Sequence, residues 1–218
     1  MKIRTLEDLQ DAIDSEMAWR KRELSAIKAN VQGARKFAKE TALRGGIALL
    51  YAHWEGGVKN IAQFYLTYVS SLRLPYNELK RNFLAISIKS DLSTYESTGK
   101  ASLQTRIVDD IFMKHTERSN IPKDGVIRTN SNLNSDVFTE IMSAIGLCCQ
   151  SYEPHYKLID EVLLNMRNKI AHGEQLGVVF SLDENRYNEI HDQIRKLIES
   201  FSIQVLNAAI LKEYKLPS

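Results

Sequence analysis

The segment NMRNKIAHG, residues 165–173, brings an arginine, an asparagine and a histidine together near the end of an amphipathic stretch. Arg167 is a permanent planar cation that suits phosphate oxygens. His172 can accept a proton near neutral pH, and the amide of Asn168, one helical turn earlier, can orient its ring. A base, an orienting amide and a phosphate clamp are the groups needed to cleave RNA through its own 2′-hydroxyl. The segment therefore indicates a candidate catalytic site.

A helix drawn through residues 159–172 has an apolar face and a polar face. At about 100° per residue, the first face holds Ile159, Leu163, Met166 and Ile170, and the roughly opposite face holds Glu161, Asn165, Asn168 and His172. Gly173 suits the left-handed position that often follows a helix, so the pattern predicts a helix end at His172. A helix end of this kind favours positive charge.

The spacing of Arg167 and His172 limits what one copy of the chain can do. The two residues are five positions apart, so on an ideal helix they point about 140° away from each other. One copy closes poorly on a single phosphate, whereas a two-fold homodimer can offer both side chains twice around one cleft. On pattern alone, the alternative is a solvated helix face with a capped C-terminus.

Composition indicates one compact domain over residues 1–218. Hydrophobic residues make up 44% of the chain, enough for an ordinary core, and 26% are charged, which argues against disorder. The net charge of +2 does not by itself indicate a nucleic-acid binder, but it leaves room for a local basic patch.

Targeting signals and metal-ligand spacings are not found. No apolar run reaches the length of a membrane span, and residues 1–17 lack the apolar core of a signal peptide, so we expect a cytoplasmic protein with no membrane partner. Cys148 and Cys149 are adjacent, which fits two small apolar residues better than a disulfide or a metal site. We therefore expect no metal ligands.

Helical periodicity dominates the chain and predicts an all-α bundle. A stretch rich in Asn, Ser, Gly and Pro at 116–135 is typical of a long surface loop. A short strand is possible at 176–183. The expected helices span residues 6–31, 47–72, 76–95, 102–115, 136–149, 155–172 and 184–214.

Arg167, Asn168, three further residues and His172 resemble the Arg-x4-His signature of the HEPN superfamily. The segments 49–69 and 131–147 are similar to parts of one prokaryotic HEPN branch that is found with toxin–antitoxin and phage-defence loci. The resemblance implies an α-helical homodimer that cleaves RNA without a metal ion or other cofactor and leaves a cyclic phosphate end. It implies that Arg167 and His172 are the catalytic pair and that Asn168 supports them.

A toxin of this kind needs an external restraint, so the resemblance also implies a possible antitoxin partner, with residues 116–135 as one surface that could receive it. Some HEPN toxins carry a tyrosine soon after the histidine, which an antitoxin modifies. Here Gly173, Glu174 and Gln175 follow His172, so we do not expect regulation by that modification.

Glu55, within the segment AHWEGG at 52–57, is a possible support for Arg167. The segment is not a His-Glu-x-x-His metal motif. The simpler alternative is a helix ion pair between Glu55 and Lys59, which are four residues apart in the favourable order.

A run of basic residues in the first helical segments could guide an RNA backbone toward the site. A solvated helix face is the alternative. The run consists of Arg20, Lys21, Arg22, Lys28, Arg35, Lys36, Lys39 and Arg44.

Two functions of different classes remain open. The first is a metal-independent endoribonuclease of the toxin or defence type, which requires the chemistry of Arg167, Asn168 and His172. The second is a non-catalytic HEPN-like helical module that binds a nucleotide or a partner protein. Both are compatible with the apolar stripe of the 159–170 segment.

Overall fold

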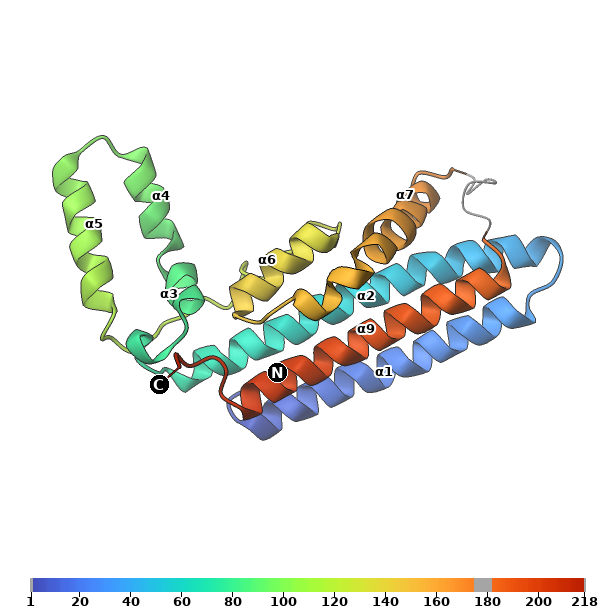
Figure 1. Ribbon diagram of the computed structural model, residues 1–218, viewed down its shortest axis with the longest axis horizontal. Coiled ribbons are helices and arrows are strands. Elements are labelled where there is room, and N and C mark those ends of the chain that lie inside the picture. The colour runs from blue at the N-terminus through green and yellow to red at the C-terminus, as the bar shows by residue number, and fades with distance from the viewer. Residues whose placement is uncertain (1, 175–181, 218) are drawn as a thin grey trace.

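The computed structural model describes residues 2–174 and 182–217, and Figure 1 shows their arrangement. In these ranges all regular secondary structure is helical, apart from two isolated bridges, Pro75–Arg118 and Leu79–Lys215. The all-α prediction is therefore confirmed. Most of the possible strand at 176–183 lies outside the described residues.

Three long helices form the body of the molecule: α1 (Leu6–Gly33), α2 (Phe37–Leu72) and α9 (Glu184–Ile210). They run side by side along their length (Figure 1) and contact one another pairwise. A capping box between Thr5 and Asp8 satisfies the first backbone N–H groups of α1. The aromatic side chains at the centre, among them Trp54, Tyr65 and Phe201, are fully buried, so these helices enclose the main core.

The start of α2 differs from the expectation. We expected a helix from residue 47, because Gly45 and Gly46 are poor helix formers. The helix instead begins at Phe37 and includes both glycines. A Cβ atom added at Gly46 would lie 2.7 Å from the ring of Tyr187 on α9, so Gly46 permits close helix packing that outweighs its low propensity.

Short helices follow α2: η1 (Tyr76–Glu78), α3 (Arg81–Ser87), α4 (Lys89–Ser97) and α5 (Ala101–Lys114). The first three replace the single helix expected over 76–95, because the chain turns at residues 79–80 and again at residue 88, whereas α5 lies close to the helix expected at 102–115. The helices α4 and α5 pair as an antiparallel arm that extends away from the long helices (Figure 1).

Residues 115–134 contain no helix or strand, as expected for the loop at 116–135. The loop is nevertheless anchored, because Ile121, Ile127 and Leu133 are buried. The hydroxyl of Ser70 on α2 also donates to the carbonyl of Ile121 at 2.9 Å. The end of the loop, at Leu133, reaches the region where the candidate site lies, because the backbone N–H of Leu133 donates to the hydroxyl of Tyr51.

Next, α6 (Ser135–Ile145) and the 3₁₀ segment η2 (Gln150–His155) lead to a π-helical segment, η3 (Leu158–Leu164), which continues as α7 (Asn165–Ala171). We expected α6 to extend to residue 149, but Gly146 adopts the left-handed conformation (φ 73°) and ends it. Within the α-helix expected over 155–172, residues 158–164 are π-helical instead. The carboxylate of Asp160 on η3 accepts both the backbone N–H (2.8 Å) and the hydroxyl (2.5 Å) of Ser135, which ties η3 to the first turn of α6.

None of the described helices is long and apolar enough to cross a membrane. The helices α6, η3 and α7 pack on α2, as Figure 1 shows, so α2 connects the main bundle to the segment that carries Arg167 and His172.

The two adjacent glycines of α2 provide a matched test of this packing. Gly46→Ala should lower the free energy of unfolding by about 1–3 kcal/mol, because the buried Tyr187 ring must move. Gly45→Ala should raise it by up to about 1 kcal/mol, because no atom lies within 4 Å of the new methyl group and alanine favours the helix. Urea denaturation measures both, and equal effects of the two substitutions would contradict the packing argument.

Candidate active site

The end of α7 has the geometry that the sequence predicts. His172 is the C-cap residue, and Gly173 follows in the left-handed conformation with φ 75°. The N–H of Gly173 donates to the carbonyl of Ile170 at 3.1 Å, and the N–H of Glu174 donates to the carbonyl of Lys169 at 2.9 Å. This pair of bonds is a Schellman motif, and it leaves the side chain of His172 exposed to solvent.

A second contact holds the segment after His172 in place. Arg44 on α2 donates from Nη1 to the carbonyl oxygen of Glu174 at 2.6 Å. The end of α7 is therefore tied to α2 as well as capped by its own backbone.

Arg167 faces α2 and the loop before α6. Its guanidinium carbon lies 4.1 Å from the centre of the Tyr51 ring, so the cation stacks on the aromatic face. Its Nη2 donates to the carbonyl of Ser131 at 2.7 Å and to Oδ1 of Asn132 at 3.3 Å. The hydroxyl of Tyr51 accepts the backbone N–H of Leu133 at 2.6 Å, so the ring and the loop hold each other in place beneath Arg167.

A shallow cavity of about 300 Å³ lies beside Arg167, between α2 and α7. Its lining includes Arg167 and Glu55 but not His172. The remaining lining residues are mostly small or apolar: Ala48, Tyr51, Ala52, Ser131, Ile170 and Ala171. The structure therefore brings Glu55 and Arg167 to one cavity and leaves His172 on the surface nearby, at the end of the same helix.

The charges around Tyr51 act in opposite directions on its hydroxyl. Burial raises the pKa of Tyr51, hydrogen bonding with Arg167 opposes this shift, and the negative charge of Glu55 adds to it. Tyr51 is thus a neutral hydrogen-bonding group at physiological pH, and it can support Arg167 but not act as a base there.

Two local pairings that the sequence spacing allows are not formed. The amide of Asn168 and the imidazole of His172 make no hydrogen bond with each other, although both side chains are described. Glu55 and Lys59 form no ion pair, although they are one helical turn apart. The carboxylate of Glu55 therefore does not pair with Lys59, the basic residue one helical turn later.

The expectation that Arg20 contacts RNA is wrong, because this residue is only 3% exposed. It donates to the carboxylate of Glu16 through Nε at 2.9 Å and Nη2 at 2.5 Å. Its Nη1 lies 3.2 Å from both the backbone oxygen and Nδ1 of His53. A Cβ atom at Gly56 would lie 2.9 Å from Nη2 of Arg20, so the glycine after Glu55 makes room for this buried ion pair.

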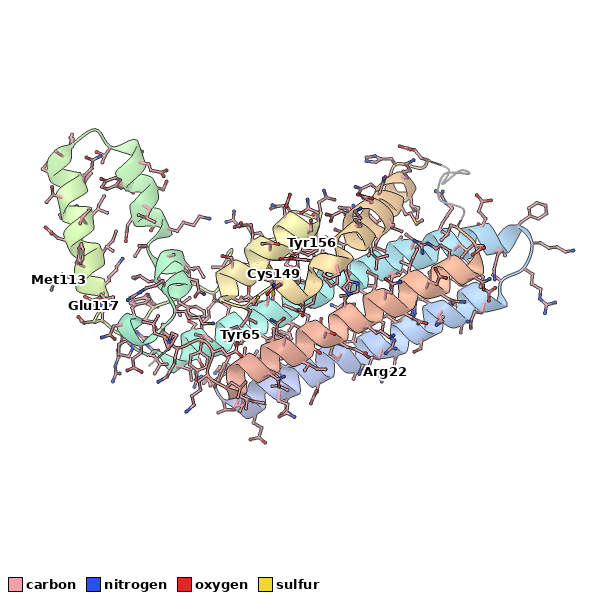
Figure 2. All side chains as sticks on the ribbon, viewed as in Figure 1. Arg22, Tyr65, Met113, Glu117, Cys149 and Tyr156 are labelled. Atoms are coloured by element: carbon pink, nitrogen blue, oxygen red, sulfur yellow. The ribbon has the colours of Figure 1, made fainter. Side chains whose placement is uncertain are left out.

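Other members of the run bind groups within the bundle. Lys28 pairs with Asp192, Lys39 with Glu184, and Lys21 with Glu199. Arg22, Arg35 and Lys36 remain exposed, but Figure 2 shows Arg22 on the side of the bundle away from α7. The run is therefore not a continuous exposed track toward His172, because packing of α1 against α2 and α9 uses several of its charges.

Tyr51 and the backbone of residues 131–133 are site components that the sequence analysis missed. Tyr51 could have been identified from the sequence, since it lies one helical turn before Glu55 and the two share a face of α2. The loop backbone had no such signal, because its role depends on where the loop packs. Among the described residues, no three His, Cys, Asp or Glu side chains gather closely enough to hold a metal ion.

A family model described as MAE_28990-like HEPN matches residues 9–214 of the chain. Comparisons with curated proteins and with solved structures found no match.

The Arg20–His53 contact predicts a pH dependence of stability. Burial lowers the pKa of His53, the charge of Arg20 lowers it further, and Glu23, whose carboxylate lies 2.9 Å from Nε2, acts in the opposite direction. The unfolded chain, in which a histidine has a pKa of about 6.5, therefore binds the proton more readily than the folded one. The free energy of unfolding should fall as the pH drops below about 6.5.

Thermal unfolding between pH 7.5 and 5 measures this effect, and that range avoids the titration of Glu16, whose pKa is held below its ordinary value. Replacing His53 with glutamine should flatten the slope. An equally steep slope in His53→Gln would assign the pH dependence to another group.

Proposed function

The chain belongs to the HEPN family, and we propose that it is a metal-independent endoribonuclease. Membership in this family is consistent with a nuclease or RNA-binding module, and the proposal of cleavage goes further. The observation that carries it is the placement of the motif. His172 is exposed at a rigidly capped helix end, and Arg167 of the same helix lines a cavity with a cation held in a fixed orientation.

In the proposed reaction, His172 takes the proton from a ribose 2′-hydroxyl, and the oxygen attacks the adjacent phosphorus. The bond from phosphorus to the 5′-oxygen of the next nucleotide breaks, and that oxygen takes a proton from solvent water, while the proton held by His172 returns to solvent. The products are a 2′,3′-cyclic phosphate and a 5′-hydroxyl. Arg167 stabilises the negative charge that grows on the phosphate oxygens, and Asn168 supports the pair from the polar face of α7.

We further propose that the site is completed by a second copy of the chain. Arg167 lines the cavity between α2 and α7, and His172 does not. A two-fold homodimer that juxtaposes two α7 ends would bring Arg167 of one protomer near His172 of the other.

A toxin or phage-defence role follows from the same proposal. A ribonuclease that acts on cellular RNA requires restraint, which a partner protein such as an antitoxin would supply. The loop at 116–135 is a candidate surface for that partner, because it joins the projecting α4–α5 arm to the region of the site.

One observation favours the non-catalytic alternative, a HEPN-like module that binds a nucleotide or a partner protein. Arg167 already donates to Ser131 and stacks on Tyr51, so it also has a structural role. Cleavage assays on variants distinguish the two functions.

The catalytic proposal predicts that His172→Ala abolishes cleavage of RNA in the presence of chelator and leaves the melting temperature unchanged. Losing the base should slow cleavage by about 10²–10⁴-fold, and an exposed side chain leaves no cavity when truncated. Arg167→Lys should slow cleavage and also lower the melting temperature, because lysine has no planar guanidinium to stack on the ring of Tyr51. His155→Ala, a histidine change on η2, is the matched control and should cleave normally. Cleavage by His172→Ala at the wild-type rate would refute the assignment.

The composite site predicts a homodimer at micromolar concentration, which light scattering measures. It also predicts that two proteins with impaired cleavage recover activity when they are mixed and exchange protomers. A heterodimer of Arg167→Lys and His172→Ala protomers retains one site with both native side chains if Arg167 and His172 come from different protomers. A monomer, or a mixture as inactive as its components, would contradict the composite site.

A further inference from the structure

The cavity beside Arg167 contains chemistry that the cleavage step does not use. Ala48 and Ala52 on α2 face Ile170 and Ala171 on α7, and these small or apolar side chains leave a space of about 300 Å³. That volume lies at the lower end of small-molecule sites. The cavity is thus an apolar slot between two helices, with the carboxylate of Glu55 and the guanidinium of Arg167 in its lining.

Glu55 is the unexplained member of this lining. It is half-buried, yet among the described residues its carboxylate forms neither a hydrogen bond nor an ion pair. Lys59, its neighbour one turn later, is exposed and does not bind it. A partly desolvated carboxylate has only acceptor sites, so a ligand with N–H donors would satisfy it.

We propose that this cavity binds a guanine base of the RNA and that Glu55 accepts the N1–H and N2–H groups of that base. The enzyme would then cleave preferentially after guanosine. The cleavage preference rests on the proposed ribonuclease function, whereas recognition of the base does not.

The donor pattern of the bases selects guanine. The Watson–Crick edge of guanine presents two adjacent N–H donors, which match the two oxygens of a carboxylate. Adenine and cytosine each place a ring-nitrogen acceptor beside their amino group, and uracil has one N–H between two carbonyls. Either arrangement points a lone pair at the carboxylate of Glu55. Single-stranded RNA is read in this way, by bases held between side chains and bonded at their Watson–Crick edges.

Arg167 connects the base to the reaction. Because it lines the same cavity, a nucleotide whose base lies against Glu55 has its own 3′-phosphate within reach of the guanidinium. The negative charge of Glu55 repels that phosphate, so the base and the phosphate have one favourable orientation in the cavity. The same nucleotide supplies the 2′-hydroxyl, which places the cut on its 3′ side.

The test is titration of the full-length wild-type protein with guanosine, adenosine, cytidine and uridine 3′-monophosphates, none of which can be cleaved. The guanosine nucleotide should bind at least about tenfold more tightly than the other three, as expected for one bidentate base contact. Glu55→Gln should remove most of that preference. Glu40→Gln, a change on the same helix outside the cavity lining, should retain it. Circular dichroism of each variant confirms that it is folded.

Equal affinity for the four nucleotides, no binding of any of them, or a guanosine preference that survives in Glu55→Gln would each overturn the proposal. Sequencing of RNA fragments separates it from the proposed function. A guanosine preference in binding without any cleavage would refute the ribonuclease and retain the guanine site. Cleavage with no preference for guanosine would refute the site and retain the ribonuclease.

Discussion

The stacking of Arg167 on Tyr51 is the contact on which the candidate site depends. It joins α7 to α2, and through the Ser131 carbonyl and the Leu133 N–H it also fixes the loop before α6. Arg167 is half-buried, so its cation–π contact contributes about 0.5–2 kcal/mol, and a hydrogen bond to a charged group contributes about 1.5–3 kcal/mol. One hydrogen-bonding group is left unsatisfied, since Nε of Arg167 is buried without a partner. The contact orients α7 against α2, and the cavity lies between these two helices.

The main bundle imposes a second constraint through its buried charges. Arg20 reaches Glu16 and His53 at the contact between α1 and α2, and Asn60 donates to the same Glu16 oxygen at 2.7 Å. Removing one partner from such a group leaves an uncompensated buried charge, so sliding α1 along α2 would be costly. Gly56, which has no side chain to block Arg20, gives the guanidinium room at this position of the helix contact. The packing of α2 against α1 in turn determines the positions of Tyr51 and Glu55, which lie on the same helix.

How much of this could be predicted depended on whether the signal was local. The helix end at His172 was predictable, because Gly173 and the preceding residues determine the Schellman motif by themselves. The buried stripe of Ile159, Leu163 and Met166 was also predictable from spacing. The π-helical segment was not, because a projection at a constant 100° per residue assumes i to i+4 bonding throughout. The burial of Arg20 could not be predicted either, since a basic residue on a helix is usually solvated and only the packing of α2 buries this one.

The dual use of Arg167 also constrains how a substrate can approach. A guanidinium has five N–H donors, and here the Nε–H is buried while one donor group, Nη2, contacts Ser131 and Asn132. The ring of Tyr51 covers one face of the cation. The donors that remain for a phosphate must therefore be reached from the cavity side, where Glu55 also lies. A ligand that enters there meets a cation and an anion in the same small space, which favours a molecule that carries both an anionic group and N–H donors. A nucleotide has both. In the proposed reaction the exposed His172 would have to reach the ribose from outside that cavity, and this is the physical argument for the proposed site shared between two copies of the chain.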